Sequence, residues 1–333
     1  MGTVDGSADV TESRLFTTGA VLDVGSRSPF APCRRLLGGL VTTARPQQWV
    51  KNLLVFAAPG AAGVLTELPV LLRAATAFWV FCLAASGTYF LNDTLDREAD
   101  GRHPVNRHRP VAAGVVPPRT AMAVAVVLLV TSVLLSLLVL GAPAAGCVGL
   151  YVAVNVAYNL RLRHEPVLDL AAVASGFVLR AIVGGLATGV HLSEWFLVVT
   201  SFASLFIVAG KREGAPAGVD PSAGPLGGAL SSGERRARPV YPVGYLRYVR
   251  ALSSGVAMAA YCLWAFDRAA RVSGHAVWLQ LTIVPFVLAM LRYALLVETG
   301  CAEAPEDVLL GDATIVALCT IWALLFAFGV YGA

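Results

Sequence analysis

Long apolar runs constrain the fold of this chain more than any other feature. A helix needs about 20 residues to cross the hydrocarbon core of a bilayer, and nine runs reach or approach that length. Hydrophobic residues make up 57% of the chain and charged residues 14%, with a mean hydropathy of +0.70, which excludes a soluble globular protein. We therefore predict an all-α, polytopic membrane protein whose nine transmembrane helices cover 53–68, 70–91, 119–140, 144–160, 167–189, 194–210, 249–266, 277–297 and 313–332.

The segments outside these runs suggest a simple domain organisation. The first 30 residues are polar and rich in Gly, Ser and Thr, without the apolar core of a signal peptide, so we expect a disordered cytoplasmic tail over 1–40. Residues 41–333 are expected to form one transmembrane domain that carries the functional site. Within it, 213–240 is rich in Gly, Ala, Pro and Ser, which predicts a flexible cytoplasmic loop.

The distribution of positive charge predicts the topology. In a nine-helix chain the connections alternate between the two sides of the membrane. The tail and the second, fourth and sixth connections hold 20 of the 25 Lys and Arg residues, so the positive-inside rule places them in the cytoplasm. The connection at 298–312 falls on the same side although it is acidic, because acidic residues contribute little to the rule.

The second connection contains the densest group of carboxylates. If the preceding helix continues, Asn92, Asp96 and Asp100 lie at i, i+4 and i+8, and Asp93 shares their face. Clustered hard oxygen ligands suit Mg²⁺, which takes its remaining ligands from water and substrate phosphates. The alternative is a solvated loop with an Asp93–Arg97 pair. We predict a magnesium site and, with it, a substrate that carries a diphosphate.

Cationic and polar side chains follow or face this group in every connection on the same side. Arginines beside carboxylates suit a magnesium–phosphate complex, since the acids bind the metal and the guanidinium groups bind phosphate oxygens. Binding of lipid headgroups, or a topology signal alone, is the alternative for any single arginine. The predicted substrate-binding residues are Lys51, Asn52, Arg97, Arg107, Arg109, Tyr158, Arg161, Arg163, Asp169, Arg180, Lys211 and Arg212.

Arg180 is the residue among these whose position is most unusual. It lies deep in a predicted span, three turns beyond Asp169 on the same face. An arginine at that depth is energetically costly and indicates a functional site. The alternative is a structural ion pair with a buried carboxylate.

Several other classes of function lack their sequence signatures. The chain has no HExxH, no GxxxxGK loop and no histidine at catalytic spacing from a Ser, Cys or second His, which argues against hydrolases and metalloproteases. A lipid-phosphate transporter without turnover is disfavoured, because transport sites favour broken helices near the midplane. No nucleic-acid partner is expected, and a homo-oligomer is left open.

With these residues the chain resembles the UbiA superfamily of intramembrane prenyltransferases, whose first motif has the form NDxxDxxxD. Asn92, Asp93, Asp96 and Asp100 match it fully, whereas the second motif, DxxxD, is represented only by Asp169, since Val173 takes its last position. The resemblance implies nine transmembrane helices around a central cavity that opens to the cytoplasm. It also implies that the protein lies in the plasma membrane.

A more specific resemblance is to the decaprenyl-phosphate phosphoribosyltransferase branch of the superfamily. It covers about 40–333, and rests on RPQQWVKN (45–52), YFLNDTLDREADGRHPVNRHRPVAAG (89–114), YNLRLRHEPVLDL (158–170), ASGFVLRAIVGG (174–185), SLFIVAGKR (204–212) and PEDVLLGD (305–312). This branch implies transfer of 5-phosphoribose from phosphoribosyl pyrophosphate to a polyprenyl phosphate, for arabinan and cell-wall precursor synthesis. The alternative is prenyl transfer from a prenyl diphosphate to an aromatic acceptor.

The resemblance also implies roles for the site residues. Asp93, Asp96 and Asp100 would be catalytic, because together with Asn92 they would hold the magnesium ion against the leaving pyrophosphate. Lys51, Arg107, Arg163 and Lys211 would bind phosphates of the donor. The attacking lipid phosphate is already mostly dianionic near neutral pH, with a second pKa of about 6, so no general base is expected.

Overall fold

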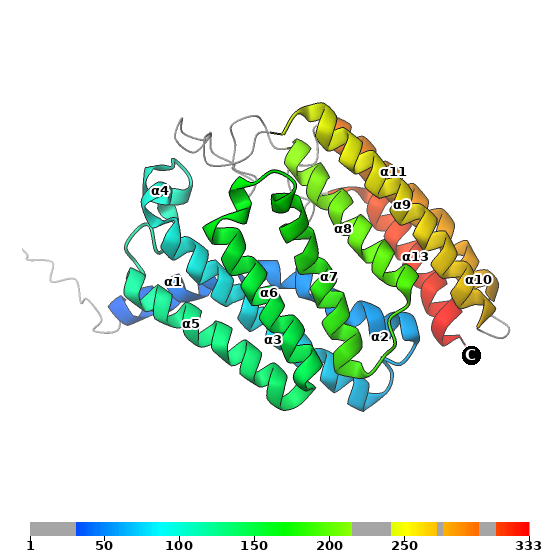
Figure 1. Ribbon diagram of the computed structural model, residues 1–333, viewed down its shortest axis with the longest axis horizontal. Coiled ribbons are helices and arrows are strands. Elements are labelled where there is room, and N and C mark those ends of the chain that lie inside the picture. The colour runs from blue at the N-terminus through cyan, green and yellow to red at the C-terminus, as the bar shows by residue number, and fades with distance from the viewer. Residues whose placement is uncertain (1–30, 215–240, 272–275, 300–310, 333) are drawn as a thin grey trace, which may run out of the picture.

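Long helices packed side by side make up the protein. The structure, a computed structural model, describes residues 31–214, 241–271, 276–299 and 311–332 (Figure 1). The described part contains helices and no strand. Eight helices or helix pairs in it are long and apolar enough to cross a membrane: α3 (Leu68–Leu95), α5 (Pro118–Leu135) with η3 (Ser136–Leu140), α6 (Ala142–Leu160), α7 (Leu168–Thr188), α8 (Glu194–Gly214), α9 (Val243–Ala270), α10 (Ala276–Leu281) with α11 (Ile283–Glu298), and α13 (Ala313–Tyr331).

The first predicted span, 53–68, has a different form. Residues Pro46–Phe56 form a 3₁₀ helix, η1, which continues into the short α2 (Ala57–Ala62). Gly63, with φ +80°, ends α2, because this left-handed conformation cannot continue a helix. At about 2.0 Å per 3₁₀ residue and 1.5 Å per α residue, η1 and α2 together extend about 31 Å, close to the thickness of the hydrocarbon core. The remaining eight predicted spans appear as long helices.

The last part of the predicted tail, 31–40, is helical. Helix α1 (Ala31–Ala44) begins inside 1–40, and its inner face contacts α3 and the segment before α5. There Leu36 and Leu40 pack against Phe90, Val111 and Val116, which gives the helix a buried face that the composition of 1–40 did not reveal. Residues 1–30, 215–240 and 300–310 lie outside the described part, and so do most of the predicted loop and most of the PEDVLLGD segment.

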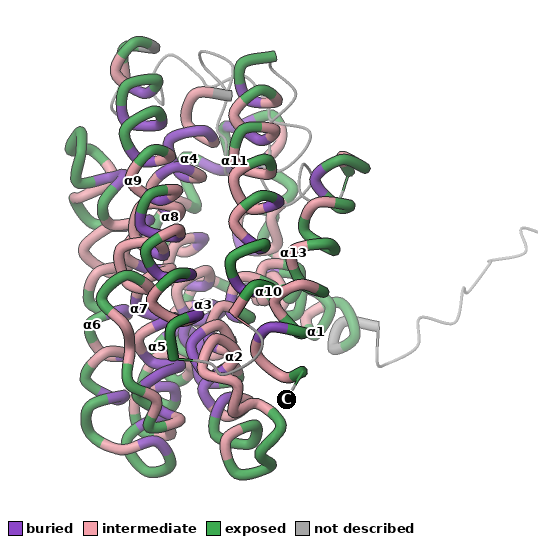
Figure 2. Tube along the Cα trace, turned by 90° about the vertical axis from the view of Figure 1, so that its right-hand side faces the viewer, coloured by how far each residue is buried: buried purple, intermediate pink, exposed green. Residues whose placement is uncertain are grey.

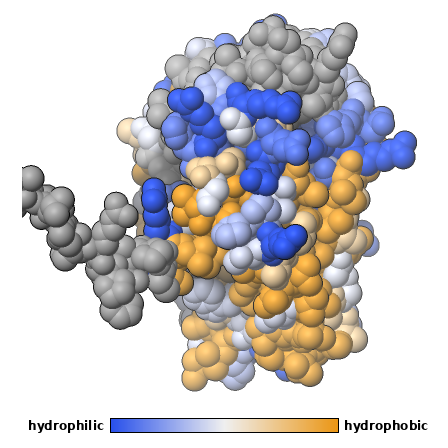
Figure 3. Space-filling model, turned by 90° about the vertical axis from the view of Figure 1, so that its left-hand side faces the viewer, coloured by the Kyte–Doolittle hydropathy of each residue, from blue (hydrophilic) through white to orange (hydrophobic). Residues whose placement is uncertain are grey.

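The surface follows the pattern of a protein that crosses a membrane. In Figure 2 exposed residues lie on the outer turns of the long helices, and many of them are large and apolar, such as Leu72, Val127 and Leu138. Figure 3 shows hydrophilic residues gathered at the end of the molecule where α4 (Arg97–Arg102) lies, above a hydrophobic surface. The protein is therefore a multi-pass membrane protein with one strongly polar end.

Close packing fixes η1 against α7. A Cβ atom added at Gly184 would lie 2.0 Å from the carbonyl oxygen of Val55, so only glycine allows the two backbones to approach this closely. The core here is formed by side chains from η1, α3, α6 and α7: Val55, Ala77, Val80, Phe81, Ala84, Ala144, Val148, Tyr151, Leu179 and Val183.

Gly184→Ala is expected to destabilise the protein by about 1–3 kcal/mol, because the added methyl group must push η1 away from α7. The measurement is the thermal unfolding midpoint in detergent. Gly149→Ala on α6 is the matched control, since a Cβ there meets nothing within 4 Å. Equal midpoints for the two variants would contradict the prediction.

Candidate functional site

The aspartate-rich stretch continues the line of α3 with one small break. Helix α3 ends at Leu95 and α4 begins at Arg97, with Asp96 between them at φ −90° and ψ 5°. The backbone amide of Asp96 donates to the Asn92 carbonyl (2.9 Å), and that of Asp100 to the Asp96 carbonyl (2.8 Å). The helical spacing assumed from the sequence is therefore preserved across the break. The side chains of Asp93 and Asp100 lie near the same guanidinium group, that of Arg109.

Each of four aspartates in this region is paired with an arginine. Asp96 is held most symmetrically, since one Arg163 nitrogen donates to both of its carboxylate oxygens at 2.8 Å. Asp93 and Asp169 are almost fully buried, so their charges depend on these partners. The shortest N–O distances are 2.8 Å for Arg45–Asp93, 2.8 Å for Arg109–Asp100, 2.8 Å for Arg163–Asp96 and 2.7 Å for Arg212–Asp169.

The four arginines come from four distant parts of the chain. Arg45 precedes η1, Arg109 follows η2 (Asn106–His108), Arg163 lies in η4 (Leu162–His164), and Arg212 lies in the last turn of α8. The site is therefore assembled only when the bundle folds. Arg45 was not among the predicted site residues, although it lies in the quoted segment 45–52; its left-handed backbone (φ 52°) has no counterpart in the sequence pattern.

Asp100 shows the electrostatic character of the cluster. Burial raises the pKa of its carboxyl group to about 6, although Arg109 opposes the shift, and the negative charges of Asp93 and Asp96 raise the pKa further. The three carboxylates thus repel one another in this region, and additional positive charge near them would be favourable.

The described residues do not form a complete metal cage. No three Asp, Glu, His or Cys side chains among them are gathered closely enough to hold an ion. Magnesium, however, commonly uses only one or two protein carboxylates together with substrate phosphates and water. Asn92, Asp93, Asp96 and Asp100 remain predicted ligands, and their donor chemistry fits an ion that arrives with a diphosphate.

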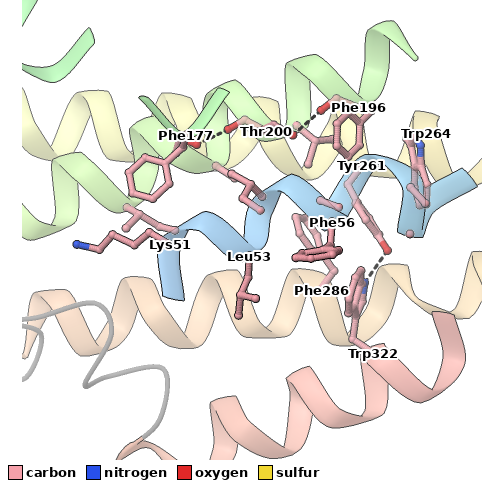
Figure 4. Close-up of a pocket in the computed structure, with 18 of the residues that line it drawn as sticks. Lys51, Leu53, Phe56, Phe177, Phe196, Thr200, Tyr261, Trp264, Phe286 and Trp322 are labelled. Carbon is pink, nitrogen blue, oxygen red and sulfur yellow. Dashed lines mark hydrogen bonds between the residues drawn. The ribbon is translucent and has the colours of Figure 1, made fainter. Parts of the chain in front are cut away.

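An apolar cavity of about 890 Å³ lies between η1, α2, α7, α8, α9, α11 and α13. Figure 4 shows Lys51 near one end and Trp264 and Trp322 near the other, with Phe56, Phe177, Phe196 and Phe286 along the walls. Tyr261 donates to Thr282 (2.8 Å) and accepts from Trp322 (2.6 Å), so its polar group is satisfied within the wall. The cavity can accommodate a long hydrocarbon chain.

The cationic end of this cavity is linked along the chain to two of the aspartate–arginine pairs. Lys51 and Lys211 both line it. Lys51 lies six residues after Arg45 on the same segment, and Lys211 directly precedes Arg212. Two chain segments thus connect the paired aspartates with the apolar cavity, which suits a ligand with a charged head and a long apolar tail.

Arg180 is buried, as the sequence analysis expected, but its partners are not carboxylates. Its guanidinium group donates to Asn52 Oδ1 (2.7 Å), the Gly176 carbonyl (2.6 Å) and Tyr151 Oη (3.0 Å). It also lies over the rings of Phe81, Tyr151 and Phe177. The alternative of an ion pair with a carboxylate is therefore wrong within the described residues. In this structure Arg180 and Asn52 anchor η1, whose neighbouring residue Lys51 lines the cavity.

The remaining predicted residues divide into two groups. Tyr158 belongs to the cluster, since its hydroxyl donates to Asp169 (3.0 Å) and accepts from Arg212 (3.2 Å). Arg97, Arg107 and Arg161 are exposed at the polar end and are not drawn into the four pairs, so their binding roles stay predictions.

Comparison with known proteins agrees with this architecture. The model of the UbiA prenyltransferase family matches residues 53–210. A decaprenyl-phosphate phosphoribosyltransferase of Corynebacterium glutamicum is 40% identical over 90% of this chain and 89% of its own length. The protein of the same name from Mycobacterium tuberculosis H37Rv is 42% identical over 87% of this chain and 94% of its own length.

The fold is shared with solved structures of low sequence identity. The structure of a UbiA homolog from Archaeoglobus fulgidus bound to GPP and Mg²⁺ aligns with a TM-score of 0.64 at 15% identity, covering 89% of this chain and 100% of that one. The relatives match nearly the whole chain, well beyond the segment recognised by the family model. The chain belongs to the UbiA prenyltransferase family, together with the decaprenyl-phosphate phosphoribosyltransferases that it resembles over most of its length.

Proposed function

We propose that this protein transfers 5-phosphoribose from phosphoribosyl pyrophosphate to a polyprenyl phosphate, such as decaprenyl phosphate, and releases pyrophosphate. The structural observation that carries the proposal is the junction between four aspartate–arginine pairs and the cationic end of an apolar cavity. This arrangement offers phosphate-binding groups for the donor next to a chamber for a lipid. The names of the relatives at 40–42% identity support the same reaction.

The donor would bind at the paired aspartates. Magnesium held by Asn92, Asp93, Asp96 and Asp100 would supply positive charge to the leaving pyrophosphate. If the carboxylates turned to the metal, Arg45, Arg109 and Arg163 would be released to bind phosphate oxygens, for which a guanidinium group is well suited. Arg212, paired with Asp169, would bind the same phosphates. The protein would thus exchange one set of ion pairs for another as the donor enters.

The acceptor would bind with its tail in the cavity and its phosphate near Lys51 and Lys211. The sequence analysis assigned these lysines to the donor, but their position in the cavity lining favours the acceptor. At about 30 Å³ per non-hydrogen atom, the share of a water molecule in the liquid, 890 Å³ holds about 30 carbon atoms, or about six isoprene units. A decaprenyl tail is longer than this, so its remaining units must leave the cavity. Val50 and Leu53 line the cavity and are each 52% exposed, which supports an opening to the lipid beside η1.

The chemistry needs few further groups. The lipid phosphate carries most of its second negative charge near pH 7 and can attack C1 of the ribose without a general base. The lysines hold it, and the apolar walls exclude water that would otherwise hydrolyse the donor.

We place this site on the cytoplasmic side of the plasma membrane, where phosphoribosyl pyrophosphate is available. The excess of Lys and Arg in the connections at the polar end supports this orientation. The product would then enter arabinan and cell-wall precursor synthesis, the role that the sequence resemblance to the phosphoribosyltransferase branch implies.

A transfer assay tests the proposal. Detergent-solubilised protein with Mg²⁺ is offered labelled phosphoribosyl pyrophosphate and decaprenyl phosphate, and separately a labelled prenyl diphosphate with aromatic acids. We expect label from the ribose donor in an organic-soluble, acid-labile lipid. Label transferred only from the prenyl diphosphate to the aromatic acid would reject the proposal in favour of ordinary prenyl transfer.

Filling the cavity is expected to weaken acceptor binding selectively. In Ala203→Trp, a large ring would project into the cavity and displace part of the tail, raising the KM for decaprenyl phosphate about tenfold or more, with the KM for the donor little changed. Ala251→Trp on α9 is the control, since Ala251 is exposed and does not line the cavity. Equal KM values for decaprenyl phosphate in the two variants would place the tail elsewhere.

A further inference from the structure

The turn that starts α7 is strained. Val167 has φ +69° and ψ −49°, and the amide of Leu168 donates to the carbonyl of Pro166 at 2.8 Å, which together define a γ-turn of the rare positive-φ kind. A β-branched residue avoids this conformation, so the turn must be held by its surroundings. The Val167 side chain is 54% exposed, so packing of that side chain contributes little.

The turn determines where Asp169 lies. The amide of Asp169 donates to the Glu165 carbonyl (3.0 Å), and that of Ala171 donates to the Val167 carbonyl (2.9 Å), so the first turn of α7 is built directly on Val167. Asp169 is 2% exposed and accepts from Tyr158 and Arg212. A change in the γ-turn would therefore shift a carboxylate that organises Arg212 beside the cavity.

Tyr241 is the side chain that holds this turn. Its hydroxyl oxygen accepts a hydrogen bond from the backbone amide of Val167 at 3.1 Å, from 74 residues further along the chain. Its ring stacks on Tyr245, with centroids 5.8 Å apart and planes 7° from parallel, and packs against the buried cluster around Leu170, Val208 and Leu246. The ring is thus fixed from the side of α8 and α9, while the hydroxyl reaches α7.

We propose that Tyr241 is a positioning residue: its hydroxyl holds the strained γ-turn at Val167 and thereby keeps Asp169 and Arg212 in the arrangement that receives the donor phosphates. The role of the arginine rests on the proposed function. The mechanical part, in which Tyr241 stabilises the turn, does not depend on it. Tyr241 acts through the turn and touches no reacting atom.

The experiment uses four forms of the full chain: wild type, Tyr241→Phe, Val167→Gly and the double variant. Loss of one hydrogen bond corresponds to about a five- to tenfold change, so Tyr241→Phe is expected to raise the KM for phosphoribosyl pyrophosphate by about that factor, with the KM for decaprenyl phosphate unchanged. Glycine adopts positive φ without strain. In the Val167→Gly background the same Tyr241→Phe change should therefore have at most a twofold effect.

Tyr245→Phe is the matched control, because it removes a hydroxyl from the stacked neighbour and leaves the turn intact; it should behave as wild type. An equal KM in Tyr241→Phe and wild type, or an undiminished effect of Tyr241→Phe in the glycine background, would overturn the proposal. The thermal unfolding midpoints of the same four proteins distinguish the effect of Tyr241 on the turn from its effect on donor binding. If wild type transfers no phosphoribose, the proposed function fails. A midpoint that Tyr241→Phe lowers in the wild-type background but not in the Val167→Gly background still supports the hydrogen bond from Tyr241 to the turn.

Discussion

Asp93→Asn is expected to reduce phosphoribosyl transfer by at least ~10²–10³-fold, the effect of removing a preorganised charge from a site where charge develops. Asp93 is 2% exposed, lies 2.8 Å from Arg45 and 3.8 Å from Arg109, and is a predicted metal ligand. Asparagine keeps the shape of the side chain but cannot neutralise a metal ion. The measurement is the initial rate of label transfer to lipid at saturating donor and magnesium.

Glu98→Gln provides the matched control for this variant. Glu98 lies in the same segment and loses the same charge, but its side chain is exposed. We expect its rate to stay within about twofold of wild type, since surface charges contribute little. An Asp93→Asn rate within twofold of wild type would remove Asp93 from the metal site and from catalysis.

Magnesium and pyrophosphate are expected to bind together, each strengthening the other by at least about tenfold, within the range of typical coupling between sites. Without ligands, the carboxylates are occupied by arginines and the arginines by carboxylates. Magnesium alone would bind the carboxylates and leave the arginines without a partner. Pyrophosphate alone would bind the arginines and leave the carboxylates without one. Isothermal titration of the protein with pyrophosphate, in EDTA and in Mg²⁺, measures the effect without turnover.

Arg163→Gln tests the cause of this coupling. It removes the guanidinium group that contacts both oxygens of Asp96. Mg²⁺ alone should therefore bind more tightly, and pyrophosphate should increase the affinity for Mg²⁺ by a smaller factor than in wild type. Arg102→Gln is the control, because Arg102 is exposed in α4 and is not among the predicted site residues. Equal pyrophosphate affinities in EDTA and Mg²⁺ for wild type would contradict the exchange of ion pairs.

The parts of the fold that follow from local composition could be predicted. Apolar runs gave eight of the membrane helices to within a few residues at most ends, because a spanning helix is specified by its own residues. The i, i+4 spacing of Asn92, Asp96 and Asp100 survives the small break at Asp96 for the same local reason. The α1 helix and the 3₁₀ form of η1 depend on tertiary contacts and could not be read in this way.

The ion pairs and hydrogen-bond partners in the candidate site could not be predicted from the sequence. The pairings Arg45–Asp93 and Arg212–Asp169 join residues 48 and 43 positions apart, and only the packing of the bundle selects them. Arg180 was correctly expected to be buried, yet its acceptors, Asn52 and a backbone carbonyl, could not be distinguished from a carboxylate partner. The contact of Tyr241 with Val167 could not be predicted from a sequence motif, because it depends on the backbone conformation of Val167.

The surroundings of Arg180 have a consequence for how anionic ligands reach the cavity. Its guanidinium group is held by neutral acceptors and aromatic rings, so its unit charge is not cancelled by any carboxylate among its described contacts. In a medium of low dielectric constant, where dissolved ions do not screen, the potential of such a charge extends much further than in water. Phe177 contacts this charge and also lines the cavity. The wall of the cavity near Phe177 therefore carries a positive potential, which favours the approach of an anionic headgroup.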